Sequence, residues 1–240
     1  MILPSFRQLI FKKHAASSFC DPAKINSSAL GRLAFFPKIG VMYNRVRKNA
    51  NSTTMIALSC LENGFVLGEK SAKRNAIRWH HLQTQFMDLS QFKRLLIVRD
   101  PYARTLSAFR DKFSKQMYID RWGKFEVSPR GYLDFLLWLR DGGLDKNSHW
   151  DLQIKSIAFP LESYSHVFKF ENIEYTLFDF LRNCNAAISD ESFLQSVKNG
   201  SQHATGSSTV INQFYGKESF RLVSELFEKD FLSIGYPFRD

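Results

Sequence analysis

Residues 95–113 read Leu-Leu-Ile-Val-Arg-Asp-Pro-Tyr-Ala-Arg-Thr-Leu-Ser-Ala-Phe-Arg-Asp-Lys-Phe. The four apolar residues 95–98 are typical of a short strand that is buried on both faces of a parallel sheet. Arg99 and Asp100 end this strand, and Pro101 suits the first turn of a helix that we expect to continue to Phe113. The stretch therefore predicts a strand, a polar loop and a helix.

The same order of elements occurs elsewhere in the chain. Residues 39–46 (Ile-Gly-Val-Met-Tyr-Asn-Arg-Val) predict a strand, and residues 53–61 have the apolar spacing of a buried helix. Residues 166–170 predict a further strand. More helices are predicted at 128–143, 175–181 and 219–227. Alternating strands and helices indicate an α/β fold, with a mostly parallel central sheet flanked by helices on both faces.

The length of 240 residues suits a single domain, and the hydrophobic fraction of 44%, with 23 Phe, supplies a large core. Residues 1–37 have weak periodicity, so we expect an irregular or helical lead-in there. Cys20, Cys60 and Cys184 are too widely spaced for a zinc knuckle or a disulfide framework, and we expect core thiols.

The net charge of +10 favours an anionic partner, such as a nucleotide, a nucleic acid, an acidic glycan or a membrane surface. Charge alone does not choose among them, and a basic surface kept for solubility is the alternative. The N-terminal residues contain no apolar run long enough for a signal peptide or a membrane span. We therefore expect a cytoplasmic protein.

The loop after the strand at 39–46 has the composition of a phosphate-binding loop. Its residues are Arg47, Lys48, Asn49, Ala50, Asn51, Ser52, Thr53 and Thr54. Small and hydroxylated side chains let the backbone approach an anion, and the helix that follows presents unpaired N–H groups. The alternative is that Ser52 or Thr53 caps the helix and Lys48 is solvated.

A second anion site is predicted at the end of the strand at 95–98. Arg99 can make a bidentate contact to a phosphate, and Ser107 lies two turns into the next helix on a similar side. A structural ion pair between Arg99 and Asp100 is the alternative.

Together these stretches resemble the uronyl 2-O-sulfotransferases and the Golgi carbohydrate 4-O-sulfotransferases, which belong to sulfotransferase family 2. Residues 43–53 look like the family's 5′-phosphosulfate loop, Y-N-R-V-P-K-x-G-S-T-S. Residues 97–113 are similar to its 3′-phosphate segment, R-D-P-x-x-R-x-x-S-A-F-R-D-K-F. His149-Trp150, residues 168–173 and the C-terminal residues 226–236 agree as well. The resemblance implies a sulfotransferase domain over residues 38–238 in a bacterial member of the family.

The resemblance also implies the P-loop-like sulfotransferase fold and the donor PAPS (3′-phosphoadenosine 5′-phosphosulfate), with no metal. Lys48 would stabilise the bridging oxygen of the leaving group, within a donor loop formed by residues 47–53. Arg99 and Ser107 would hold the 3′-phosphate. The chain departs from the family pattern at Arg47, which replaces Pro, and at Ala50, which replaces Gly.

The resemblance implies a general base near the acceptor. His80 and His81 stand between the two phosphate segments, roughly where the uronyl enzymes have a catalytic His, and His81 is slightly preferred. A structural role for these histidines beside Trp79 is the alternative. His149 is a competing candidate for the base.

The expected acceptor is a hydroxyl group, on a carbohydrate that can itself be anionic. Residues 200–206 could close over the donor, or they could be a plain surface loop. Basic residues that could line the acceptor, with solvated charge as the default interpretation, are Lys112, Lys115, Arg121, Lys124 and Arg130.

Two other functions stay open from the residues alone. A nucleotide-dependent phosphotransferase would need a magnesium-binding Ser or Thr after the loop Lys, but Asn49 follows Lys48. A basic nucleic-acid-binding module would need aromatic residues interleaved with basic ones on one surface, but most Phe residues have core spacing. We therefore expect no nucleic-acid partner.

Overall fold

The computed structural model describes residues 6–65, 68–78, 88–184 and 210–239. The chain is divided into two compact units. The first comprises residues 1–46, 50–98 and 155–202, and the second comprises residues 47–49, 99–154 and 203–240. The chain therefore passes from one unit to the other on both sides of Lys48, and again after Val98.

The first unit contains a five-stranded sheet with the order β3-β1-β2-β4-β5. Its strands are β1 (Leu33–Phe36), β2 (Val41–Asn44), β3 (Ile77–Arg78), β4 (Lys93–Val98) and β5 (His166–Lys169). β4 pairs in parallel with β2 and with β5, which confirms the three strands predicted from the sequence. β1 pairs antiparallel with β2 and β3, and it was missed because it lies within the stretch expected to be irregular or helical.

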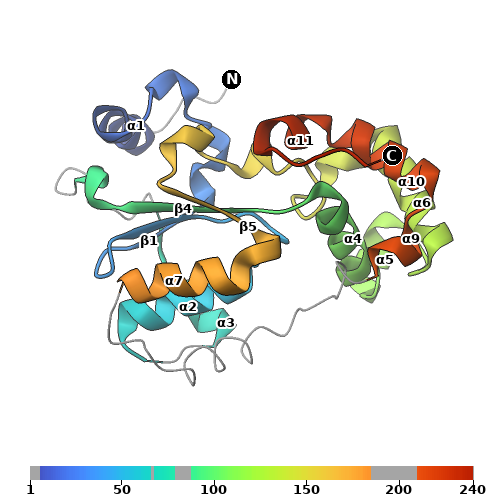
Figure 1. Ribbon diagram of the computed structural model, residues 1–240, viewed down its shortest axis with the longest axis horizontal. Coiled ribbons are helices and arrows are strands. Elements are labelled where there is room, and N and C mark those ends of the chain that lie inside the picture. Colours follow the sequence, from blue (N-terminus) through green and yellow to red (C-terminus); the bar gives the residue numbers. More distant parts are fainter. Residues whose placement is uncertain (1–5, 66–67, 79–87, 185–209, 240) are drawn as a thin grey trace. The chain divides into compact units, whose positions relative to one another are not determined.

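Alternate side chains of the sheet point to opposite faces, as the pleat requires. Ala34, Tyr43 and Ile97 pack with α2 (Asn51–Asn63) and α7 (Ile173–Cys184) in one buried cluster, and both helices lie on the same face of the sheet (Figure 1). α3 (Glu69–Asn75) packs against α2.

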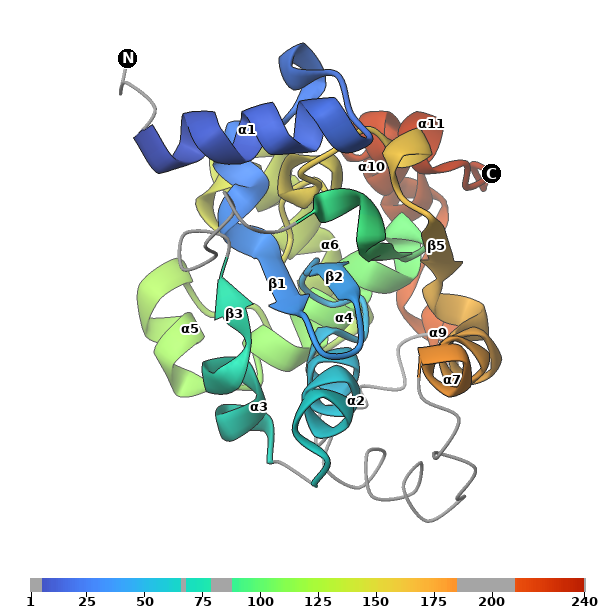
Figure 2. The same cartoon turned by 90° about the vertical axis from the view of Figure 1, so that its left-hand side faces the viewer.

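The opposite face of the sheet is covered by α1 (Phe6–Ser18), which runs across it (Figure 2). Phe11 of this helix meets Phe35 of β1 edge to face, with ring centroids 6.1 Å apart. The prediction of helices on both faces of the sheet is thereby confirmed.

The second unit is helical. Its helices are α4 (Pro101–Lys112), α5 (Gln116–Trp122), α6 (Pro129–Trp138), α9 (Ile211–Phe214), α10 (Lys217–Leu226) and α11 (Glu228–Ile234). The predicted starts of α4 and α6 are confirmed by their caps. Asp100 accepts a hydrogen bond from the Tyr102 N–H (2.9 Å), and Ser128 accepts one from the Gly131 N–H (3.1 Å).

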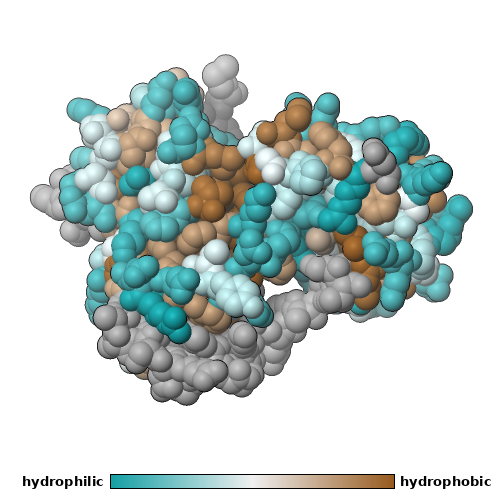
Figure 3. All heavy atoms as spheres, viewed as in Figure 1, coloured by the Kyte–Doolittle hydropathy of each residue, from teal (hydrophilic) through white to brown (hydrophobic). Residues whose placement is uncertain are grey.

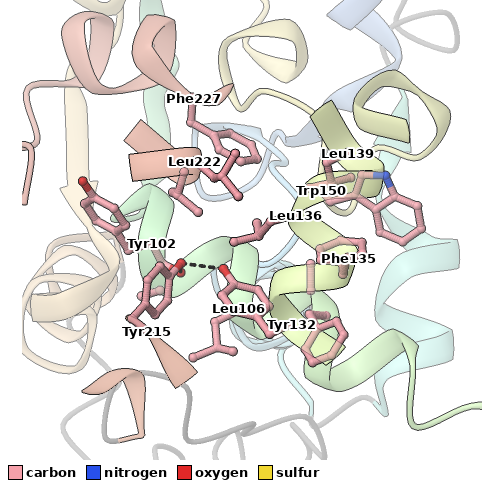
Figure 4. Close-up of a cluster of buried hydrophobic side chains, with 14 of the residues drawn as sticks. Tyr102, Leu106, Tyr132, Phe135, Leu136, Leu139, Trp150, Tyr215, Leu222 and Phe227 are labelled. Carbon is pink, nitrogen blue, oxygen red and sulfur yellow. Dashed lines mark hydrogen bonds between the residues drawn. The ribbon is translucent and has the colours of Figure 1, made fainter. Parts of the chain in front are cut away.

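Aromatic side chains dominate the core of the second unit (Figure 4). α10 illustrates the amphipathic pattern, because Leu222 and Val223 are fully buried whereas Arg221 and Glu225 form an exposed ion pair on the outer face (2.8 Å). Figure 3 shows the hydrophilic outer surface over this helix.

Three buried tyrosines form a hydrogen-bonded chain in this core. The Tyr215 hydroxyl donates to the Tyr102 carbonyl oxygen (2.8 Å), so the hydroxyl of Tyr132, 2.5 Å from that of Tyr215, must be the donor to Tyr215. Tyr215 therefore holds the centre of the chain, and its loss would leave the buried Tyr132 hydroxyl without its acceptor.

We expect Tyr132→Phe to lower the free energy of unfolding by about 1 kcal/mol, because it removes one hydrogen bond and orphans no donor. Tyr215→Phe should cost about 2–3 kcal/mol, since the Tyr132 donor then stays buried and unsatisfied. Urea unfolding followed by circular dichroism measures both. Equal losses, or a larger loss for Tyr132→Phe, would contradict this order of donors.

Candidate functional site

The loop between β2 and α2 has an unusual backbone. Lys48 and Ala50 both have positive φ angles, +70° and +51°, in the left-handed region that favours glycine. Ala50 is also the N-cap of α2, and no side-chain hydrogen bond caps the helix. The alternative in which Ser52 or Thr53 caps α2 is therefore not what the structure shows. The loop's conformation explains why a glycine would suit position 50.

The Lys48 side chain is largely shielded from water and is paired in the second unit. Its Nζ lies 3.0 Å from Oδ2 of Asp111, and only 9% of the Lys48 side chain is exposed. The same carboxylate is 2.9 Å from Lys112 Nζ and 2.5 Å from Lys115 Nζ. The alternative of a solvated Lys48 is thereby excluded.

Burial and charge act on Lys48 in opposite directions. Burial lowers the pKa of Lys48 to about 8, and the Asp111 carboxylate limits this fall, whereas Lys112 and Arg99 add to it. The surrounding lysines hold the pKa of Asp111 far below its usual value, against the effect of its own burial. Asp111 is therefore a carboxylate at any physiological pH, and Lys48 is mostly an ammonium near neutrality.

Arg99 follows β4 directly and is tied to the same loop. Its Nη1 donates to the Lys48 carbonyl oxygen (2.8 Å). The Gln153 side chain accepts from the Arg99 N–H (3.1 Å) and donates to the Arg99 carbonyl (2.8 Å), and it also accepts from Asn49 Nδ2 (2.6 Å). The Gln153 amide thus links Asn49, which follows Lys48 in the chain, to the backbone of Arg99.

Arg99 and Ser107 are both buried, with 4% and 2% exposed. Asp100, the partner in the alternative ion-pair interpretation of Arg99, caps α4 and pairs with Arg239 (2.5 Å). The second unit contains five residues of the predicted donor site, which are Arg47, Lys48, Asn49, Arg99 and Ser107.

Arg104 fixes the backbone around these residues. Its fully buried guanidinium donates to the carbonyl oxygens of Arg47 (3.2 Å), Ser148 (3.4 Å) and Asp151 (2.7 Å). Burial lowers the pKa of Arg104 to about 10, so it remains charged. The resemblance includes this arginine as a motif letter, but its role as a backbone clamp was not predicted.

His149 lies beside Arg47. Nδ1 of the imidazole is 2.6 Å from Asn147 Oδ1, an acceptor, so Nδ1 carries the proton. Nη1 of Arg47 lies 2.9 Å from Nε2 and 3.1 Å from Nδ1, so the guanidinium is over the ring rather than in line with either nitrogen. Burial, followed by the charges of Lys112, Arg47 and Lys48, lowers the pKa of His149 well below its usual value. The ring is therefore neutral, and its burial among these cations makes it a weak base.

The rest of the predicted donor loop, Ala50–Thr53, belongs to the first unit. Ser52 Oγ donates to Glu69 Oε1 (2.7 Å) and accepts from Lys73 Nζ (3.2 Å), and Lys73 also pairs with Glu69. Asn51 Oδ1 accepts from Arg45 (3.3 Å). Ser52 therefore sits in a polar cluster at the start of α2.

His80, His81 and residues 200–206 lie outside the described residues, so their predicted roles stay predictions. Lys112, for which solvated charge was the default interpretation, is instead buried against Asp111 and 5.0 Å from the Tyr118 ring.

Among the described residues, no group of three or more His, Cys, Asp or Glu side chains is placed to hold a metal ion. Within those same ranges, no helix is both long and apolar enough to cross a lipid bilayer.

Ala50→Gly should raise the free energy of unfolding by about 0.5–1 kcal/mol, because relief of the left-handed strain exceeds the added chain entropy of glycine. Ala16→Gly, within α1, is the matched control and should lower it by about 1 kcal/mol. Urea denaturation of both variants is the measurement. A loss of stability in Ala50→Gly would contradict the strained conformation of the loop.

Comparison with known proteins agrees with these motifs. A sequence model of the sulfotransferase family matches residues 31–237. No curated protein and no solved structure gave a significant match. Because the matched region covers most of the chain and includes both predicted phosphate segments, the protein belongs to the sulfotransferase family and is a sulfotransferase.

Proposed function

We propose that this sulfotransferase takes its sulfuryl group from PAPS and transfers it to a carbohydrate hydroxyl by in-line displacement. The acceptor oxygen forms a bond to sulfur while the bond between sulfur and the 5′-phosphate oxygen breaks. The electron pair of that bond leaves with adenosine 3′,5′-bisphosphate, and a base takes the acceptor's proton. The observation that carries this proposal is the joining of Lys48 and Arg99 through the Lys48 carbonyl (2.8 Å).

The donor carries a 3′-phosphate, a 5′-phosphate and a sulfate, and the cations of the second unit fit such an anion. Lys48, Arg99, Lys112 and Lys115 all belong to this unit, with Asp111 as the carboxylate among the lysines. Lys48, Arg99 and Lys112 are shielded from water, so they would interact strongly with an anion, whereas Lys115 is exposed. Lys48 would stabilise the charge that develops on the bridging oxygen of the leaving group.

Arg99 and Ser107 would bind the 3′-phosphate, and so distinguish PAPS from nucleotides that lack it. Arg99 is well suited because its planar guanidinium can donate two parallel hydrogen bonds to a phosphate. The Gln153 amide fixes the Arg99 backbone on both sides, which limits the freedom that this side chain would lose on binding.

The start of α2 would supply the remaining 5′-phosphate contacts. Residues 50–53 begin a 13-residue helix whose first N–H groups have no partner within the helix. Ser52 would exchange its hydrogen bond to Glu69 for one to the phosphate, while Lys73 keeps the carboxylate paired.

The general base is assigned to His81, with His80 as its neighbour and alternative. His149 is less suitable, because its burial and the neighbouring cations Lys112, Arg47 and Lys48 disfavour the protonated ring that a general base must form. The net charge of +10 suits an acceptor that is itself anionic, and Arg121, Lys124 and Arg130 are exposed side chains of the second unit that could meet it.

Isothermal titration with adenosine 3′,5′-bisphosphate, AMP and ATP tests the donor assignment. We expect a clear preference for the bisphosphate. Lys48→Met and Arg99→Ala should each weaken its binding by about 10-fold to 100-fold, the worth of one charge-assisted contact.

Lys124→Met, which removes an exposed charge of the same unit, is the matched control and should bind like the unmodified chain. A preference for ATP would favour a phosphotransferase instead. Equal binding of AMP and the bisphosphate would remove the 3′-phosphate role of Arg99.

A further inference from the structure

Asp111 on α4 contacts three lysine ammonium groups, Lys48 (3.0 Å), Lys112 (2.9 Å) and Lys115 (2.5 Å). We propose that Asp111 is a positioning residue that keeps Lys48 charged and held near α4 until the donor's anionic oxygens replace the carboxylate. This inference rests on the proposed role of Lys48 in sulfuryl transfer, and it assigns Asp111 no contact with the reacting atoms.

The groups around Lys48 explain why it needs a carboxylate. Arg99 approaches from the end of β4 and Lys112 from α4, and both disfavour a second positive charge. His149 is a neutral ring, so it adds no negative charge. Among the described residues, the Asp111 carboxylate favours the charged form of Lys48 through both its charge and its hydrogen bond. A neutral amine at this position could not stabilise a developing anion.

The other two lysines explain how Lys48 can leave. Breaking a buried ion pair is costly when it strands one charge without a partner. Here Lys112 and Lys115 stay on the carboxylate after Lys48 departs, with Lys115 on Oδ1 and Lys112 on Oδ2. Lys48 shares Oδ2 with Lys112, so Asp111 can release Lys48 without leaving an oxygen unpaired.

Any ion pair between Asp111 and Lys48 raises the pKa of Lys48, so this pKa tests the contact itself, and the pH dependence of nucleotide binding tests its role in the site. The first readout is the pKa of Lys48, followed by nuclear magnetic resonance of lysine labelled with carbon-13 at Cε, from about pH 6 to about pH 11. Lys48→Met identifies the Lys48 signal.

In the full-length chain without nucleotide, Asp111→Asn should lower the pKa of Lys48 by about one unit or more, the usual effect of losing an adjacent opposite charge. Asp111→Glu restores the carboxylate and should return the pKa most of the way. Lys112→Met should shift it in the opposite direction, upward, because Lys112 disfavours the charged form of Lys48.

Asp134→Asn is the matched control, since it removes a carboxylate of the same unit whose ion-pair partner is Arg130. An unchanged Lys48 pKa in Asp111→Asn, or an equal shift in Asp134→Asn, would overturn the proposal. If Asp111→Asn does not fold, Lys112→Met still tests the network around Asp111, because a downward shift or no shift there contradicts it.

A second measurement connects the network to the donor. Bisphosphate affinity should fall as Lys48 loses its proton, and in Asp111→Asn this fall should begin at a pH lower by about one unit or more. Absence of bisphosphate binding would refute the proposed function but leave the nucleotide-free pKa result standing. Normal binding with no change in its pH dependence would refute the role of Asp111 alone.

Discussion

The side-chain amide of Gln153 is the contact on which the candidate site depends. A primary amide carries a donor and an acceptor side by side, so it can pair with the N–H and the C=O of one residue, as it does with Arg99. Its oxygen also accepts from Asn49, next to Lys48 in the chain. The Gln153 N–H is in turn held by the buried Asp230 carboxylate (2.8 Å). Two segments about 50 residues apart in sequence are thus fixed by one neutral group that adds no charge to an anion site.

Neutral partners recur among the arginines near Lys48. Arg104 donates to three carbonyl oxygens, Arg99 donates to the Lys48 carbonyl and the Arg47 guanidinium lies against a neutral imidazole. Carbonyl and imidazole acceptors orient a guanidinium without cancelling its charge, unlike a carboxylate. Asp111, in contrast, is a carboxylate that shares its negative charge among three lysines. The positive potential that would attract an anionic donor therefore persists while the side chains stay ordered.

The sequence was informative where local pattern determines structure. The apolar run before Arg99 predicted β4, and Pro101 predicted the start of α4. β1 was missed because its four residues follow a stretch of small side chains, and its pairing with β2 depends on the turn around Gly40, where φ is +61°. Lys48 and Arg99 could be predicted from their places after strands. The roles of Asp111 and Gln153 could not, because their partners lie about 50 to 100 residues away in sequence and only tertiary packing brings them together.

The two departures from the family pattern have different physical consequences. At position 47 the carbonyl that Arg104 clamps would be present in proline too, so the exchange to arginine leaves the clamp intact and adds a guanidinium, which engages His149. At position 50 the backbone keeps the left-handed conformation that glycine favours, although alanine adopts it at a cost. The first exchange therefore changes the chemistry beside Lys48, whereas the second leaves a left-handed residue that is not glycine at position 50. The strained conformation of Ala50 is constrained by the residues on either side, which are Lys48, Asn49 and the start of α2.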